Sequence, residues 1–218
     1  VRPRYRSCIQ AASELADLVP MFTSVLKLKE NLSTSTGSRA TARSVHQMRV
    51  KLTNAGRDRK SSVYMVTSAG SGEGKTNLAL SLGASFAASG FRTLVIDADL
   101  AGRGATIGLG VEGLPGLREA AECGSLRDHI RGTPDGLCIL PTGADDQFNA
   151  YAIPQAAIEH LIEEAREMFQ VVILDTGAVF NCIEASMLAP WADGVLFVVA
   201  KGQRESLVEQ SLQHLASL

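Results

Sequence analysis

The stretch VYMVTSAGSGEGKT at 63–76 limits what this chain can fold into more than any other part of the sequence. Its first residues, 63–67, form a short, apolar, β-branched run of the kind found in buried strands. The glycines that follow leave backbone N–H groups free to turn around phosphate oxygens, and the helix expected from Lys75 adds its positive N-terminal end. The stretch therefore predicts a strand, a phosphate-binding loop and a helix. The alternative is a plain glycine-rich turn, which the flanking strand and helix disfavour.

The loop matches the nucleotide-binding pattern G-x-x-x-x-G-K-[ST] except at its first position, where Ala69 replaces glycine. Ala69 is tolerable if its φ is negative, because the phosphates approach the later part of the loop. In this pattern Lys75 reaches the β- and γ-phosphates and the Thr76 hydroxyl coordinates Mg²⁺. The dinucleotide fingerprint G-x-G-x-x-G fails, since Lys75 occupies the position of its third glycine. We expect ATP or ADP to be bound by Gly70, Ser71, Gly72, Glu73, Gly74, Lys75, Thr76 and Asn77.

Two further apolar runs end in aspartate. The run 92–97 (RTLVID) predicts a buried strand that ends at Asp97 and is followed by Asp99, and the run 171–175 (VVILD) has the Walker B pattern and ends at Asp175. Open α/β sheets bind ligands at the carboxyl ends of their strands, so we expect these aspartates beside the glycine loop. There they would position Mg²⁺ and water for phosphoryl transfer. Asp97 and Asp99 are otherwise simple caps of the next loop, a reading that the glycine loop upstream disfavours.

The remaining strand-like and helix-like stretches alternate along the chain. We expect two more strands at 137–140 and 194–200, and helices at 76–89, 116–123, 126–130, 154–169, 181–189 and 205–218. This βαβα alternation predicts an α/β fold with a doubly wound, mostly parallel sheet, the fold of P-loop NTPases. A glycine-rich segment at 100–116, with Arg103 as its one cation, is expected to form a mobile loop over the site.

With 218 residues, 45% of them hydrophobic, the chain can bury one sizeable core. We divide it into a basic juxtamembrane-like linker, 1–39, and a nucleotide-binding domain, 40–218, that begins with a helix at 40–54. The apolar stripe of this helix, which either packs on its own domain or docks onto another subunit, consists of Val45, Met48 and Leu52. The polar run before it, 33–38, is expected to be flexible. The chain begins at Val1 rather than Met and ends within a helix-like stretch, so we expect a segment of a longer protein.

Charge is unevenly distributed along the chain. Residues 1–60 carry 12 Lys and Arg against 4 Asp and Glu, which leaves 9 basic and 19 acidic residues in 61–218. A basic N-terminal segment of this kind can bind nucleic acid, an anionic membrane surface or the acidic residues 61–218 of a neighbouring copy. Aromatic residues for stacking on single strands are scarce there, so we expect no nucleic-acid partner. The uncharged run at 77–91 is shorter than the about 20 residues that a membrane span needs.

The cysteines and histidines predict no metal site. The cysteines have neither the C-x-x-C spacing of zinc sites nor a disulfide pattern, which indicates a reducing compartment. They are Cys8, Cys123, Cys138 and Cys182. The four histidines are scattered along helix-like stretches, and we assign them no chemistry.

Together, the motifs at 68–76, 94–99 and 171–175 resemble those of the bacterial tyrosine kinases, the cytoplasmic P-loop domains of polysaccharide co-polymerases. The resemblance runs from about residue 17 to the end of the chain. Its further matching segments are 113–117, 137–143 and 192–199, and 19–26 is similar to the linker that leads into the kinase domain.

This resemblance implies a protein-tyrosine autokinase that regulates exopolysaccharide or capsule synthesis and export at the cytoplasmic face of the inner membrane. The implied catalytic residues are Lys75, Asp97 and Asp99, and the implied metal residues are Thr76, Asp99 and Asp175. Asp97 would activate the incoming tyrosine hydroxyl. The implied partner is a transmembrane and extracytoplasmic part of the same polypeptide, or a separate activator, with residues 2–6 as the basic flank of a membrane helix.

The sequence departs from the family at several places. The family's inter-subunit helix carries a Glu and two Arg at three-residue intervals, where this chain has Arg43, His46 and Arg49. The family's Arg two residues after the second aspartate is Ala101 here, and its Pro-Pro pair after the Walker B Asp-Thr is 177–178, Gly-Ala. The family's tyrosine-rich tail is not in this segment. We therefore expect secure nucleotide binding but only weak self-association.

Three functions remain open on this basis. The first is a tyrosine kinase, and the second is a nucleotide-switched assembly regulator without kinase activity. The third, an ATPase of the partitioning and division-site kind, is disfavoured because Gly70 stands where those proteins carry a signature lysine. The tyrosines are Tyr5, Tyr64 and Tyr151, which form no cluster, so we expect slow ATP hydrolysis and poor self-phosphorylation.

Overall fold

The computed structural model describes residues 35–144 and 153–218, with side chains from residue 41 on. The predictions for residues 2–6, 19–26, Tyr5 and Tyr151 lie outside the described residues. In chain order the elements are α2 (Ser35–Ala55), β1 (Ser62–Ser68), α3 (Lys75–Ala87), β2 (Thr93–Asp97), α4 (Gly104–Gly108), α5 (Leu117–Cys123), β3 (Arg131–Gly132), β4 (Cys138–Leu140), α6 (Gln155–Met168), β5 (Val171–Ala178), α7 (Ile183–Leu188), the 3₁₀ turn η2 (Ala189–Trp191), β6 (Gly194–Val198) and α8 (Glu205–Ala216).

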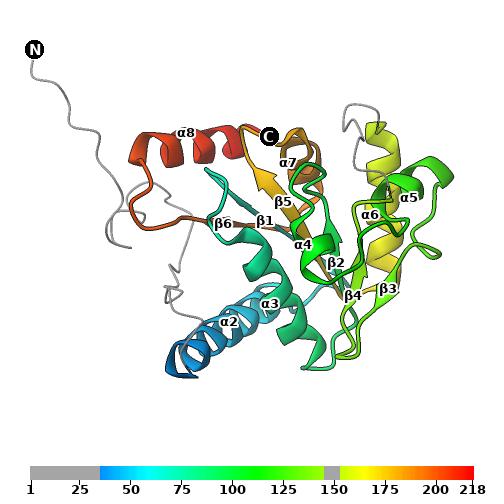
Figure 1. Ribbon diagram of the computed structural model, residues 1–218, viewed down its shortest axis with the longest axis horizontal. Helices are drawn as coiled ribbons and strands as arrows, with labels where there is room; N and C mark the ends of the chain where they lie inside the picture. Colours follow the sequence, from blue (N-terminus) through cyan, green and yellow to red (C-terminus); the bar gives the residue numbers. More distant parts are fainter. Residues whose placement is uncertain (1–34, 145–152) are drawn as a thin grey trace, which may run out of the picture.

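The strands form one sheet in the order β3-β4-β2-β5-β1-β6. All neighbouring strands run parallel except β3, which pairs with β4 in the antiparallel direction. Every residue of β1, β2 and β5 is buried, as expected for strands covered on both faces. The predicted α/β fold with a mostly parallel sheet is confirmed (Figure 1).

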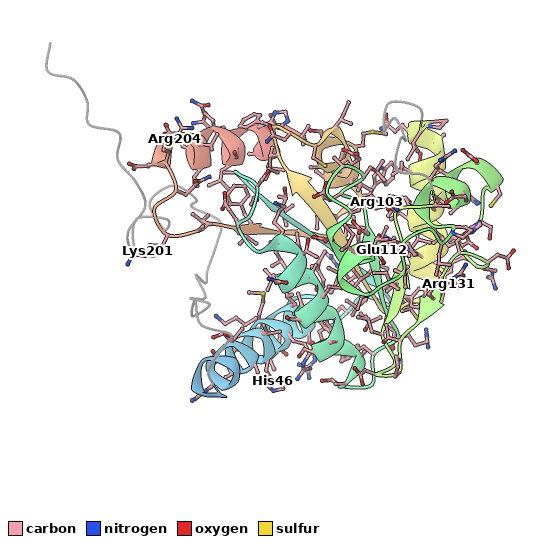
Figure 2. All side chains as sticks on the ribbon, viewed as in Figure 1. His46, Arg103, Glu112, Arg131, Lys201 and Arg204 are labelled. Carbon is pink, nitrogen blue, oxygen red and sulfur yellow. The ribbon has the colours of Figure 1, made fainter. Side chains whose placement is uncertain are left out.

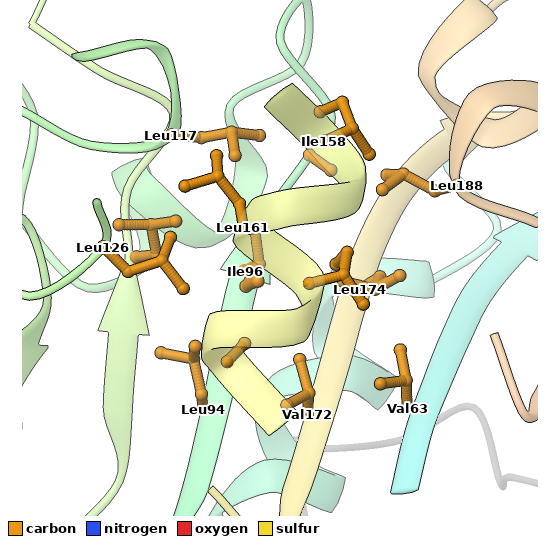
Figure 3. Packing of buried hydrophobic residues seen from close by; sticks show 14 of the residues in the cluster. Val63, Leu94, Ile96, Leu117, Leu126, Ile158, Leu161, Val172, Leu174 and Leu188 are labelled. Atoms are coloured by element: carbon orange, nitrogen blue, oxygen red, sulfur yellow. The ribbon is translucent and has the colours of Figure 1, made fainter. Parts of the chain in front are cut away.

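Helices cover both faces of the sheet (Figure 1). On one face, Leu78, Leu82 and Phe86 of α3 pack against one set of strand residues that includes Val66 and Ile173. On the other face, helices α5, α6 and α7 cover the alternate strand residues, several of which Figure 3 labels around α6. These are Val63, Met65, Leu94, Ile96, Val172 and Leu174. The period-two alternation of side chains along each strand therefore divides the interior into two hydrophobic clusters.

Helix α2 packs on its own domain. Val45 is buried, and Met48 and Leu52 pack against the same cluster as α3. The hydroxyl of Tyr64 in β1 donates a hydrogen bond to the carbonyl of Leu52 over 3.0 Å. Of the two roles proposed for the apolar stripe, packing within the domain is confirmed. The helix begins at Ser35, so the expectation of a flexible run at 33–38 is wrong from that residue on.

Several predicted boundaries are corrected by tertiary contacts. The helix predicted at 126–130 is only a single turn, in which the N–H groups of His129 and Ile130 donate to the carbonyl of Leu126, while the N–H of Leu126 donates to the Glu164 carboxylate over 2.7 Å. Strand β5 runs on to Ala178, so Asp175 lies within the strand rather than at its end. The helix predicted at 181–189 is confined to Ile183–Leu188. Within the described residues, no helix combines the length and the apolar character needed to cross a membrane.

Candidate nucleotide site

The glycine loop joins the end of β1 to the start of α3. Gly72 and Gly74 have φ angles of 75° and 91°, in the left-handed region that glycine adopts without strain. Arg103 is the one non-glycine residue with positive φ among the described residues, so Ala69 meets the condition of a negative φ. The backbone of the loop therefore has the form that the sequence pattern requires.

Lys75 is almost completely buried, at 7% exposure, and its side chain lies along the loop. Its Nζ donates a hydrogen bond to the carbonyl of Gly70 over 3.3 Å. The hydroxyl of Ser68 donates to the same carbonyl over 2.6 Å. Thr76 is half-buried at the start of α3, and Ser71 and Asn77 are exposed. The lysine ammonium is thus held at the phosphate-binding loop by a single weak contact that a phosphate oxygen can replace.

Asp97 and Asp175 face each other across neighbouring strands. They are paired in the register of β2 and β5, and both are fully buried. Asp97 Oδ2 accepts hydrogen bonds from the N–H and the hydroxyl of Thr106, each over 2.7 Å. Asp97 Oδ1 accepts from the N–H of Asp99 over 3.3 Å. Burial raises the pKa of Asp97 to about 6.

Asp175 differs from Asp97 because no donor meets hydrogen-bond geometry at either of its carboxylate oxygens, although the Thr76 hydroxyl and the Lys75 ammonium lie close enough to lower its pKa in part. Burial, together with the negative charge of Asp97, raises the pKa of Asp175 to about 7. A buried carboxylate without partners is costly unless a cation neutralises it. Asp175 therefore lies where a bound divalent cation would compensate its charge.

Mg²⁺ fits this donor set. Among the described residues, no three acidic, His or Cys side chains converge into a metal cage of their own. Mg²⁺ at nucleotide sites needs fewer protein ligands, because it keeps several waters and binds phosphate oxygens as well. The unpartnered Asp175 carboxylate, the Thr76 hydroxyl and the half-buried Asp99 supply oxygens of that kind.

Gly177 provides room for this cluster. A Cβ atom on Gly177 would lie 2.7 Å from Cβ of Cys182 and 3.3 Å from Oδ1 of Asp99. Contacts that short would displace the Cys182 backbone or the Asp99 carboxylate. The replacement of the family's first proline by Gly177 therefore suits the local packing of this chain.

The segment 100–116 is anchored to the loop that follows β4. It contains helix α4, preceded by Arg103 with a φ of 50°. The Arg103 guanidinium donates to Thr142 Oγ1 over 3.1 Å and to the carbonyl of Gly143 over 2.9 Å. We predicted a mobile loop, but the structure has a short helix held by these hydrogen bonds and by the bonds of Thr106 to Asp97. Arg103 is thereby engaged by protein oxygens.

Glu73 contacts the segment after β6. Its carboxylate accepts hydrogen bonds from the N–H of Ala200 over 3.1 Å and from Nε2 of Gln203 over 2.8 Å. Sequence reasoning placed Glu73 among the nucleotide-binding residues but did not identify Gln203 or Thr106. Nothing in one sequence signals these two, because each acts through a residue far away along the chain.

Comparison with known proteins agrees with this geometry. Residues 64–189, more than half of the chain, match the sequence model of the CobQ/CobB/MinD/ParA nucleotide binding domain. The chain belongs to this family. Within the CobQ/CobB/MinD/ParA family, it is 36% identical over 166 residues to the succinoglycan biosynthesis transport protein ExoP of Rhizobium meliloti, and the match covers 71% of this chain and 20% of ExoP.

The chain is also 28% identical over 155 residues to the tyrosine-protein kinase CpsD of Streptococcus pneumoniae, covering 66% of this chain and 65% of CpsD. The kinase domain of the Escherichia coli tyrosine kinase ETK superposes with a TM-score of 0.70 at 22% identity, covering 96% of this chain and 83% of that domain. The ETK match shows the fold alone. The resemblance to bacterial tyrosine kinases is confirmed, although the chain spans a fifth of ExoP and less than two thirds of CpsD.

Proposed function

We propose that this chain is the ATP-binding domain of a membrane-associated regulator of exopolysaccharide synthesis and export, and that it transfers the γ-phosphoryl group of ATP to tyrosine. The observation that carries the proposal is the buried, unpartnered carboxylate of Asp175 beside a glycine loop that ends in Lys75 and Thr76. Mg²⁺ that binds together with a nucleotide would neutralise this buried carboxylate and so explain its position. The similarity to ExoP and CpsD supports the polysaccharide context.

In this proposal each residue has one task. The N–H groups of the loop hold the phosphates, and Lys75 exchanges its bond to Gly70 for a phosphate oxygen. Thr76, Asp99 and Asp175 would hold Mg²⁺, which would supply positive charge at the phosphates when bound. Asp97 accepts the proton of the tyrosine hydroxyl as the γ-phosphoryl group passes to that oxygen and ADP leaves. The two hydrogen bonds from Thr106 orient the Asp97 carboxylate.

One observation favours a second function, a nucleotide-switched assembly regulator without kinase activity. Asp97 is 0% exposed, and both of its oxygens already accept hydrogen bonds from the protein. A tyrosine hydroxyl reaches such a carboxylate only after α4 moves. Both functions share the nucleotide site and differ in the acceptor of the phosphoryl group.

The same relatives support a proposal for the setting of the domain. We propose that residues 1–39, of which 35–39 form the first turn of α2, are a basic linker at the cytoplasmic face of the inner membrane and that residues 40–218 form the nucleotide-binding domain. The partners are ATP and either the membrane part of the same polypeptide or a separate activator. Self-association is weak, and nucleic acid is not a partner.

Calorimetry with Mg·ADP tests the shared nucleotide site. We expect binding to the natural chain and no measurable binding to Lys75→Ala, because a cation at the phosphates is lost. Lys60→Ala is the matched control, since Lys60 is exposed just before β1, at the end of that strand away from the glycine loop. Equal affinity in the natural chain and in Lys75→Ala would show that the site is elsewhere.

Intact-mass measurement separates the two functions. The chain is incubated with Mg·ATP, with and without a tyrosine-rich peptide. Phosphate on the peptide, absent with Lys75→Ala, supports the kinase, whereas ATP hydrolysis without any phosphorylated tyrosine supports the regulator.

A further inference from the structure

The turn after β6 lies directly beside the glycine loop. Strands β1 and β6 are parallel and in register from Tyr64 and Gly194 to Ser68 and Val198, so the segments that follow them leave the same edge of the sheet. Gly202, with a φ of 89°, turns the chain back toward α8. Figure 2 shows Lys201 and Arg204 at this turn. We call residues 200–204 the β6 turn.

Glu73 joins the β6 turn to the glycine loop. Its half-buried carboxylate accepts hydrogen bonds from the Ala200 N–H over 3.1 Å and from Gln203 Nε2 over 2.8 Å. Burial raises the pKa of Glu73, whereas hydrogen bonds from the N–H groups of Ala200 and Gly70 lower it. The Glu73 side chain therefore faces another part of the protein, and only its backbone is available to a phosphate.

Gly70 leaves the space through which this connection runs. A Cβ atom on Gly70 would lie 2.8 Å from Gln203 Nε2 and 2.8 Å from Glu73 Oε1. Both atoms are the ends of flexible side chains, so even an alanine at position 70 would push Glu73 and Gln203 apart without shifting backbone. The contact between Glu73 and Gln203 therefore requires a glycine at position 70.

The order of the strands gives the direction of a bound nucleotide. Asp97 and Asp175 lie on β2 and β5, on one side of β1, and β6 lies on its other side. A nucleotide whose terminal phosphate met these carboxylates would extend from the glycine loop toward β6. The nucleoside half would then lie beside the β6 turn.

We propose that Glu73 is a positioning residue that latches the β6 turn onto the glycine loop, and that this latch holds the nucleoside half of the bound nucleotide. The inference rests on the proposed nucleotide site and adds a task for Glu73 and Gln203 within it. Because the latch acts on the nucleoside side, its loss weakens nucleotide binding and spares the binding of phosphate chains without a nucleoside.

Calorimetry with two ligands, Mg·ADP and Mg-tripolyphosphate, tests the latch in the whole chain. For Glu73→Ala and for Gln203→Ala we expect about tenfold weaker binding of ADP and less than about twofold change for tripolyphosphate, since a charge-assisted hydrogen bond is lost in each. The double variant should lose no more than either single variant, because both remove the same latch. Gly70→Ala should also weaken ADP binding by displacing the two side chains, but because Gly70 lies in the phosphate-binding loop itself, only the Glu73 and Gln203 variants are compared between the two ligands.

The controls change the same residue types elsewhere. Glu163→Ala on α6 and Gln210→Ala on α8 remove exposed side chains and should leave both affinities unchanged. Glu73→Gln keeps an oxygen that accepts from Ala200 and should restore most of the ADP affinity lost in Glu73→Ala.

The possible results separate the latch from the nucleotide site itself. If the natural chain binds neither ligand, both the proposed function and the latch are wrong. If it binds ADP but Glu73→Ala and Gln203→Ala bind ADP equally well, the latch alone is wrong. Equal losses for ADP and tripolyphosphate, or additive losses in the double variant, would also refute the latch, since they would mean that the glycine loop itself has collapsed or that the residues act separately.

Discussion

Asp175 carries a buried charge that the nearby Thr76 hydroxyl and Lys75 ammonium compensate only in part. Its pKa, raised to about 7 by burial and by Asp97, exceeds the value near 3.9 of an unfolded aspartate. The folded state therefore binds this proton more strongly than the unfolded state. The resulting stabilisation is complete below about pH 4 and is lost as the pH rises through about 7.

We therefore expect Asp175→Asn to raise the melting temperature of the ligand-free protein more at pH 8 than at pH 5. The gain at pH 8 should be roughly 2–4 kcal/mol, or about 5–10 °C, because the incompletely compensated charge is removed. Asp135→Asn, an exposed substitution, should change the melting temperature by less than about 1 °C at either pH. Equal shifts at both pH values would argue against a buried, incompletely compensated carboxylate.

Whereas Asp175→Asn is expected to stabilise the ligand-free protein, substitution of the buried aspartates should impair catalysis. Asp97→Asn and Asp175→Asn are expected to leave the circular dichroism spectrum unchanged and to lower ATP turnover by about 100-fold or more, since each removes charge where metal and nucleophile are aligned. Steady-state phosphate release measures this. Natural turnover in both variants would contradict the roles given to these carboxylates.

At the scale of the secondary elements, α2 is fixed by one stripe of side chains. Val45 is 4% exposed and Val50 is 41% exposed on the same helix. Val45→Ala should lower the free energy of unfolding by about 1–2 kcal/mol, because it leaves a cavity against α3. Val50→Ala should change it by less than about 0.5 kcal/mol. Urea denaturation of the two variants makes the comparison, and an equal effect would mean that α2 is not docked as described.

The elements that the sequence predicted well are those determined by local pattern. Strands β1, β2 and β5 are continuous apolar runs, and α3 follows a glycine loop with a fixed form. Helix α4 and strand β3 have no such pattern and depend on long-range hydrogen bonds. Thr106 reaches Asp97, and Glu164 holds Leu126. For the same reason the glycine loop and the aspartates could be predicted as one site, whereas Thr106 and Gln203 could not.

For the molecule as a whole, charge predicts only weak association between copies. On α2, Arg43 and His46 are exposed where the related kinases carry a Glu and an Arg, and Arg49 lies 3.2 Å from a ring nitrogen of His46 in the same helix. Surface ion pairs contribute about 0–1 kcal/mol each, too little to hold a ring. Light scattering at moderate salt should show mainly monomer at micromolar concentration. A stable ring under those conditions would contradict this expectation.

Because β1, β2, β5 and β6 run parallel, the residues of the proposed nucleotide site come from chain positions as distant as Ala69 and Gln203, yet they meet at one edge of the sheet. A ligand there bridges segments that belong to the beginning and the end of the folded domain. Its binding energy should be shared by the whole domain and add about 2.7 kcal/mol to stability at a hundredfold excess over its dissociation constant. Bound nucleotide should therefore slow the exchange of backbone amide hydrogens in α8 as well as in α3. The bound molecule would then act as a non-covalent staple between the two ends of the domain.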